Sequence, residues 1–206
     1  FELGDANVFY TRRIGHAPTY HPELGENQFI DYPDNTSILS AAKISGKSKN
    51  GLAVGVLHSL TAGENAELST NGIKKNLQVE PLTSYTVGRL QQDFNEGTTV
   101  LGGIFTATNR FINDPYLEFL NTNAYTGGFD LLHQWNDKEL FVDAKIIGSA
   151  ISGSTEAIQN LQLSSARYFQ RSDASYMNFD PTRTSLSGQG GRVKIGQGRK
   201  GFCRYS

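Results

Sequence analysis

The sequence is poor in cysteine, methionine, tryptophan and proline, and its charges nearly cancel. The 206 residues include one Cys, one Met, one Trp and six Pro. A single cysteine, Cys203, excludes an intramolecular disulfide and a cysteine-rich metal centre. Nineteen Lys and Arg against 20 Asp and Glu give a net charge of −1. Since this balance removes the electrostatic argument for nucleic-acid binding, we expect no nucleic-acid partner.

Long hydrophobic runs are missing as well. No window approaches the roughly 20 apolar residues of a membrane-spanning helix. Glu2 and Asp5 follow Phe1 closely, so the first residues lack the basic-then-apolar pattern of a signal peptide. We expect either a mature chain or a piece of a longer one.

Glycine and aromatic residues are what the sequence has in quantity. There are 22 glycines, and aromatic residues reach 11% although hydrophobic residues total only 37%. This composition is typical of an all-β chain with little helix, and it does not favour a thick aliphatic core.

Alternating residue patterns bounded by turn residues predict about nine strands. Several are longer than the five or six residues usual in soluble proteins and match the roughly 9–11 of a tilted membrane-spanning strand. The predicted strands are 8–14, 37–47, 51–61, 82–94, 98–110, 124–135, 139–151, 163–171 and 184–196. After the seventh, Thr155–Gln159 could form a short helix.

Short and long connections alternate along the first seven predicted strands. Tight turns are expected at 49–51, 95–97 and 136–138, where Asn and Gly favour positive φ. The connections between them, 15–36, 62–81 and 111–123, are long and polar. Short turns at one end and long loops at the other are typical of an up-and-down outer-membrane barrel.

Alternation also predicts two different faces. On 124–135, Tyr125, Phe129 and Trp135 share one face, with Asp130 on the other. Tyr125 and Trp135 lie toward opposite ends of the strand, where membrane interfaces favour aromatic rings. A soluble sandwich with its apolar side inward would show the same alternation, so periodicity leaves both folds open. The faces of 82–94 and 98–110 are unassigned.

Charged residues on these strands are the candidate functional residues. A Lys or Arg facing lipid at the bilayer midplane costs roughly 2–4 kcal/mol, so in a barrel such charges must point inward. The alternative is a solvated outer face of a soluble sheet. The lumen-facing candidates are Lys43, Asp130, Asp143, Lys145, Arg167 and Arg171.

Motifs for catalysis or cofactor binding are weak. Residues 41–48 fit a relaxed phosphate-binding loop, but that loop needs a following helix, and here a turn and a strand follow. Lys47 and Lys49 are interpreted instead as solvated charges beside a hairpin. The loop residues His16, His21 and Glu23 define no metal geometry. We predict no catalytic residues, no metal site and no cofactor, and the sequence favours a non-enzymatic role.

Several segments together carry a family resemblance. They are 10–15, 38–47, 80–90, 102–110, 124–128 and 167–171. In this order they resemble an uncharacterised family of Gram-negative outer-membrane proteins. Its members have a carbohydrate-binding family 9-like domain followed by a large C-terminal domain of unknown function, read as a β-barrel. The resemblance implies a fold and an outer-membrane location, and it supplies no catalytic residues.

These observations predict an all-β fold, an antiparallel up-and-down meander forming a segment of a transmembrane β-barrel. Residues 1–196 would be a partial barrel domain and 197–206 a divergent tail, from a truncation or frame shift. The expected function is passage or surface handling of carbohydrate-related material, with the outer-membrane lipid bilayer, and carbohydrate, as partners. The alternatives are a soluble β-sandwich that binds glycans, and part of a carbohydrate-active hydrolase whose site lies outside this chain.

Overall fold

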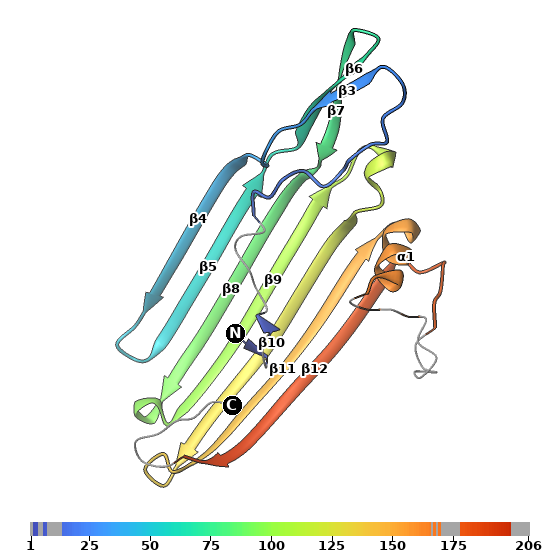
Figure 1. Ribbon diagram of the computed structural model, residues 1–206. Coiled ribbons are helices and arrows are strands. Elements are labelled where there is room, and N and C mark those ends of the chain that lie inside the picture. The colour runs from blue at the N-terminus through green and yellow to red at the C-terminus, as the bar shows by residue number, and fades with distance from the viewer. Residues whose placement is uncertain are drawn as a thin grey trace.

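A computed structural model describes residues 2–3, 6–7, 14–165, 167, 169 and 178–198. Its main feature is a single antiparallel sheet of seven long strands, in the order β12-β11-β10-β9-β8-β5-β4 (Figure 1). The predicted antiparallel meander is therefore confirmed. The strands are β4 (Ile38–Lys47), β5 (Leu52–Thr61), β8 (Leu82–Phe94), β9 (Thr99–Phe111), β10 (Asn121–Trp135), β11 (Leu140–Gly153) and β12 (Ser185–Gln197).

The tight turns lie at one end of this sheet and the long connections at the other (Figure 1). Gly51 has a φ of 84° in the turn from β4 to β5, and the β8–β9 connection is a 3-10 turn, η2 (Asn95–Gly97). Residues 136–138 all have positive φ between β10 and β11. The three predicted turns are thus confirmed.

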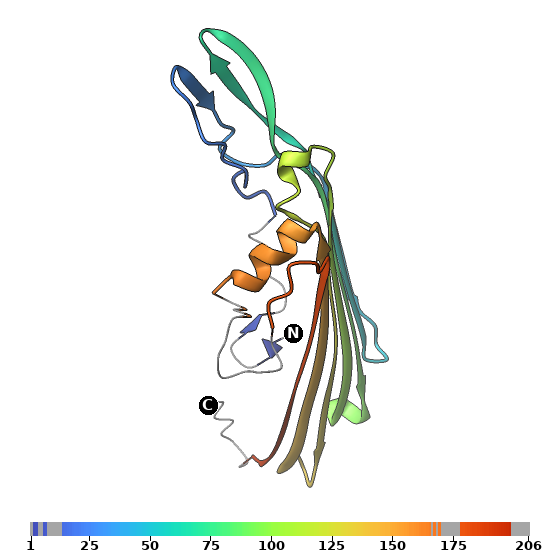
Figure 2. The same ribbon diagram turned by 90° about the vertical axis from the view of Figure 1, so that its right-hand side faces the viewer.

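A second sheet of three strands forms inside two segments that the sequence analysis treats as loops. It contains β3 (Gln28–Asp31), β6 (Glu64–Thr70) and β7 (Ile73–Glu80), in the order β3-β6-β7. The loop prediction is wrong there because these strands are polar and lack a strong alternating pattern. Only the Asn71–Gly72 turn, with positive φ at both residues, marks the hairpin. This sheet projects beyond the main sheet at the long-connection end (Figure 2).

The predicted strand 163–171 is wrong. A helix, α1 (Thr155–Leu163), fills the start of this connection, as the sequence suggested for Thr155–Gln159, and residues 164, 165, 167 and 169 form turns and bends. The Oγ of Ser154 caps the helix by accepting a hydrogen bond from the Ala157 amide (3.0 Å). Predicted strand 8–14 lies outside the described residues except Ile14, which is in a turn.

The main sheet therefore contains seven long strands where the sequence predicted about nine in a meander. Two-residue strands β1 (Glu2–Leu3) and β2 (Ala6–Asn7) pair only with each other. The short 3-10 turn η3 (Pro115–Leu117) precedes β10. No helix in the described part of the chain is long and apolar enough to cross a membrane.

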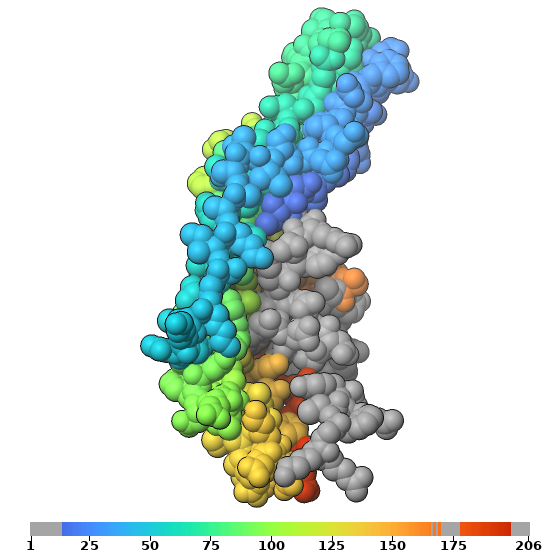
Figure 3. Space-filling model, turned by 90° about the vertical axis from the view of Figure 1, so that its left-hand side faces the viewer, coloured from blue at the N-terminus to red at the C-terminus, as the bar shows by residue number. Residues whose placement is uncertain are grey.

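The main sheet is open, and its middle is not buried under a second layer. Within the described residues β4 and β12 each have one strand neighbour, and Figure 3 looks onto the β4 side of the molecule. The fully buried apolar residues Val79, Leu117 and Ile158 all lie in or next to the long connections. The hydrophobic core thus sits at one end, where the connections pack against the strand ends.

Candidate functional site

The two faces of the seven-stranded sheet differ completely in charge. Residues directly opposite in an antiparallel pair point to the same face, so the register assigns every side chain. All Asp, Glu, Lys and Arg residues on the seven strands fall on one side, here called the charged face. They are Lys43, Lys47, Arg89, Asp93, Arg110, Asp130, Asp143, Lys145, Arg192 and Lys194.

The opposite side, here called the apolar face, carries large exposed hydrophobic side chains. Phe129 is 72% exposed, Ile44 75% and Ile195 77%, and no described element covers them. Large contiguous apolar surfaces are typical of protein or membrane interaction sites and of ligand-binding grooves. The larger residues of this face are Ile44, Val54, Val56, Leu90, Leu101, Phe105, Phe129, Ile146, Val193 and Ile195.

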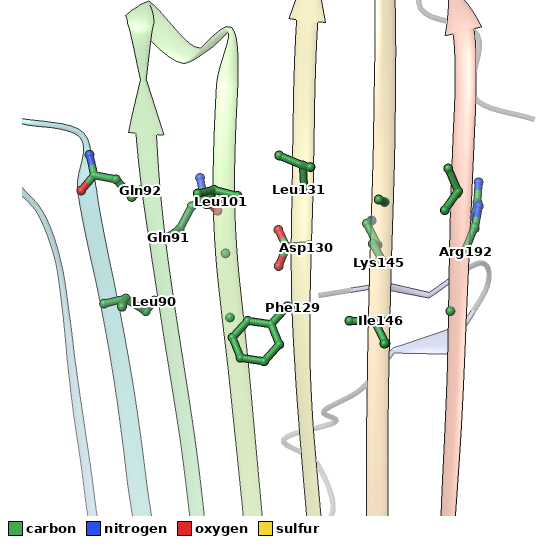
Figure 4. A pocket seen from close by; sticks show the side chains of 15 residues that line it. Leu90, Gln91, Gln92, Leu101, Phe129, Asp130, Leu131, Lys145, Ile146 and Arg192 are labelled. Atoms are coloured by element: carbon green, nitrogen blue, oxygen red, sulfur yellow. The ribbon is translucent and has the colours of Figure 1, made fainter.

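One row of opposed residues crosses the whole charged face. Asp130 pairs in register with Lys145, and Lys145 with Arg192. Figure 4 shows these side chains at one level on neighbouring strands, with Phe129 and Ile146 in the next row. From β4 to β12 the row that contains Asp130 consists of Lys47, Ala53, Gln91, Gly102, Asp130, Lys145 and Arg192.

An ion pair in this region spans three strands. Arg89 on β8 donates from Nη1 and Nη2 to the two carboxylate oxygens of Asp130 on β10, and the Nη2 contact is 2.9 Å. Its guanidinium passes over Gly102 on the intervening β9. A Cβ at Gly102 would lie 2.7 Å from both Asp130 oxygens, so any larger residue must displace the pair. The bidentate geometry is the stronger form of such a contact.

Further contacts extend this pair toward the β4 edge. Lys47 Nζ lies 2.5 Å from Asp93 Oδ2. Gln91 links the two pairs, because its Nε2 donates to Asp93 (3.0 Å) and its Oε1 accepts from Arg89 (3.3 Å). The network thus connects strands β4, β8 and β10 across the face.

Basic residues outnumber acidic ones on the charged face by seven to three. Each acidic residue has a basic partner: Asp93 pairs with Lys47, Asp130 with Arg89, and Asp143 lies 4.0 Å from Lys145. The face therefore carries a net positive charge, although the whole chain is close to neutral.

Described residues of the connection between β11 and β12 lie over the charged face. Leu186, on this face of β12, is only 8% exposed, and α1 leans to one side of the sheet (Figure 2). Buried Gln162 anchors the connection, since its side chain exchanges two hydrogen bonds with the backbone of Asp180 (2.8 and 2.9 Å). The hydroxyl and amide of Thr182 hydrogen-bond the Asp180 carboxylate and, with Arg183, lower the pKa of Asp180.

A pocket of about 400 Å³ lies between this connection and the strands β10 to β12. Its lining includes Arg167 and Phe169 from the connection and the hydroxyl-bearing Thr126 and Ser149 from the charged face. A second hollow, of about 720 Å³, is shallow and almost entirely hydrocarbon-lined. It includes Leu90, Leu101, Phe129, Leu131, Ile146 and Val193, all on the apolar face.

A family model described as a domain of unknown function (DUF5916) matches residues 2–177. The chain belongs to this family. The DUF5916 match includes α1 and every long strand except β12, which lies beyond it. No curated protein and no solved structure matches the chain.

Four of the six candidate residues predicted from the sequence of this chain lie on the charged face. Lys43, Asp130, Asp143 and Lys145 share it, although Lys43 on β4 lies apart from the Asp130–Lys145 pair. Arg167 is not on a strand, because the segment after α1 turns, and it lines the pocket under the connection. Arg171 lies outside the described residues.

Sequence reasoning missed the partners that complete the network. Lys47, interpreted as a solvated charge beside a hairpin, is 60% exposed at the end of β4, but its pairing with Asp93 was not predicted. Arg89 stayed unassigned because 82–94 allowed either face, and only the register with β5 and β9 resolves it. Alternation of Arg89, Gln91 and Asp93 was the available signal.

The loop histidines are not grouped with metal ligands. His16 Nε2 lies 3.8 Å from the buried carboxylate of Glu80, which also accepts a hydrogen bond from the Thr19 amide (2.8 Å). Within the described part of the chain, no three His, Cys, Asp or Glu side chains cluster as metal ligands do.

Proposed function

We propose that this chain forms part of the wall of an outer-membrane β-barrel. Its apolar face contacts lipid, and its charged face lines an aqueous interior. The observation that carries the proposal is the complete separation of charge in the main sheet, with every Asp, Glu, Lys and Arg of its seven strands on one face and none on the other. In a soluble single-layer sheet nothing selects against charge on one exposed side.

The dimensions of β10 agree with a bilayer. From Tyr125 to Trp135 the strand rises about 34 Å, at about 3.4 Å per residue. A tilt of about 40° reduces this to about 26 Å, close to the roughly 25 Å apolar band of outer-membrane barrels. Asp130 lies halfway along this span, where a charge facing lipid would be most unfavourable.

The open edges restrict how such a barrel closes. Six antiparallel pairings separate β4 from β12, so these two strands run in the same direction. Closing an all-antiparallel ring therefore needs an odd number of further strands, the first antiparallel to β12. A second copy in the same membrane orientation would place its β4 parallel to β12 and could not complete the ladder.

The proposed role is passage or surface handling of carbohydrate-related material, as the family resemblance of the sequence suggests. The described residues of the β11–β12 connection support a passage of restricted width, because they lie over the charged face and would narrow the interior. Loops and helices inside a barrel set what enters. The three-stranded sheet β3-β6-β7 would then stand at the outer surface.

The alternative of a soluble β-sandwich is not supported by the apolar face. A sandwich buries one face of each sheet against the other across about 10 Å. Here the second sheet extends from the end of the first, and Phe129 and Ile146 remain 72% and 60% exposed.

Detergent extraction followed by gel electrophoresis tests the proposal. We expect the full-length protein, which includes the strands that close the ring, to require detergent and to migrate differently before and after boiling, because a closed hydrogen-bonded barrel resists unfolding by detergent at room temperature. A monodisperse protein in plain buffer, with no heat-dependent mobility, would exclude the proposed function.

A further inference from the structure

We infer that the charged face selects anionic solutes. This inference rests on the proposed function and adds the class of solute. It starts from the excess of basic over acidic residues, seven to three, on the face that would line the interior.

The acidic residues cannot offset this excess, because their charges are already compensated. Asp93, Asp130 and Asp143 each lie within ion-pair distance of a basic side chain. Within the described residues no carboxylate forms an ion pair with the four remaining cations, which are Lys43, Arg110, Arg192 and Lys194. These four supply the uncompensated positive charge.

The four uncompensated basic residues are spread over the charged face rather than clustered at one end of the strands. Lys43 is on β4, while Arg192 and Lys194 are at the opposite side of the sheet on β12. Arg110 lies near the long connections, where its Nη1 donates to the Asn121 carbonyl (3.0 Å). An anion would meet positive charge at successive positions, as in pores whose walls carry Arg or Lys.

The pocket under the β11–β12 connection provides a binding position for such an anion. Arg167 brings a cation to a cavity of about 400 Å³ that also holds the hydroxyl-bearing Thr126 and Ser149 and the ring of Phe169. Guanidinium and hydroxyl groups together suit a small organic anion, such as a hydroxylated carboxylate or phosphate.

Ion selectivity of the full-length protein, with the strands that close the ring, in planar lipid bilayers tests this inference, with K⁺ and Cl⁻ as probes across a KCl gradient. We expect a reversal potential of the sign that indicates Cl⁻ preference. The preference should weaken as the salt rises from 0.1 M to 1 M, because the screening length falls from roughly 10 Å to 3 Å.

Charge-neutralising variants identify the residues responsible for the Cl⁻ preference. The triple variant Lys43→Gln, Arg192→Gln, Lys194→Gln should lower the Cl⁻ to K⁺ permeability ratio by roughly threefold or more. The single variant Arg192→Gln should lower it by less. The control Lys74→Gln, which removes a cation from β7 in the projecting sheet, should leave the ratio unchanged.

The outcomes separate this inference from the proposed function. A conducting, heat-modifiable protein that prefers K⁺, or whose selectivity ignores the triple variant, overturns anion selection and leaves the barrel intact. A protein that neither conducts nor shows heat-modifiable mobility overturns both. Retained heat-dependent mobility of each variant confirms that the substitution did not unfold the protein.

Discussion

The apolar and charged faces of the seven-stranded sheet differ in composition and in contacts, although their residues alternate along the same strands. On β10, Phe129 is 72% exposed while its neighbour Asp130 is held by Arg89. The apolar face carries no Asp, Glu, Lys or Arg, whereas the charged face contains specific ion pairs. Under the proposed function each face meets a different solvent, lipid on one side and water on the other.

Moving a charge to the wrong face should give the largest effect. Phe129→Arg places a cation on the apolar face near the middle of β10, and we expect a loss of about 2–4 kcal/mol of unfolding free energy in lipid vesicles. The matched control Leu132→Arg adds the same charge to the charged face, opposite Asp143. Urea unfolding followed by Trp135 fluorescence measures both. Equal destabilisation by the two substitutions would argue against the assignment of the faces.

Adding a side chain at Gly102, where the Arg89 guanidinium crosses β9, should give the next largest effect. Gly102→Ala puts a Cβ where the Arg89–Asp130 pair lies, so we expect a loss of about 1.5–3 kcal/mol. Gly55→Ala is the control, because its Cβ would meet only Arg89 Cβ, at 4.0 Å, on the same face. The same urea titration compares them. A Gly102→Ala protein as stable as Gly55→Ala would show that the pair does not depend on this glycine.

Double-mutant cycles should rank the ion pairs of the charged face. The bidentate Arg89–Asp130 pair should show a coupling energy of about 1 kcal/mol or more, and the 4.0 Å Lys145–Asp143 pair less than about 0.5 kcal/mol. The substitutions are Arg89→Gln with Asp130→Asn, and Lys145→Gln with Asp143→Asn. Equal couplings would indicate that long-range charge, rather than paired geometry, organises the face.

The smallest effect should be confined to the β11–β12 connection. Because hydrogen bonds lower the pKa of Asp180 in the folded protein, its ionised form stabilises this connection at neutral pH. That contribution should disappear as the pH falls through the lowered pKa and Asp180 becomes protonated. Limited proteolysis between pH 7 and pH 3 should show increasing cleavage within 154–184. Asp180→Asn should remove this pH dependence, and if cleavage of the variant still rises with acid, another group is responsible.

Strand positions were largely predictable from the sequence, because long alternating runs ended by Asn and Gly leave few choices. The runs 82–94 and 184–196 correspond to β8 and β12 within one residue at each end. The prediction failed at 163–171, where a capped helix and turns occur, and at β6 and β7, whose polar sequences lack a strong alternating pattern.

The site was predictable only where alternation within one strand defined the face. Asp130 and Lys145 were predicted in this way, because each lies between two apolar residues in its strand. The Arg89–Asp130 pair could not be found, because it joins strands two apart and depends on a glycine between them. Such contacts follow from register across three strands, which a single sequence does not contain.

Cysteine labelling along β10 tests the central claim most directly. In a Cys203→Ser background, single cysteines replace Thr126 and Leu132 on the charged face, and Phe129 and Leu131 on the apolar face. With the protein in lipid vesicles, a charged water-soluble maleimide should modify Thr126→Cys and Leu132→Cys. It should spare Phe129→Cys and Leu131→Cys until the protein is unfolded. Equal labelling at all four positions, or labelling of the apolar face alone, would contradict the account.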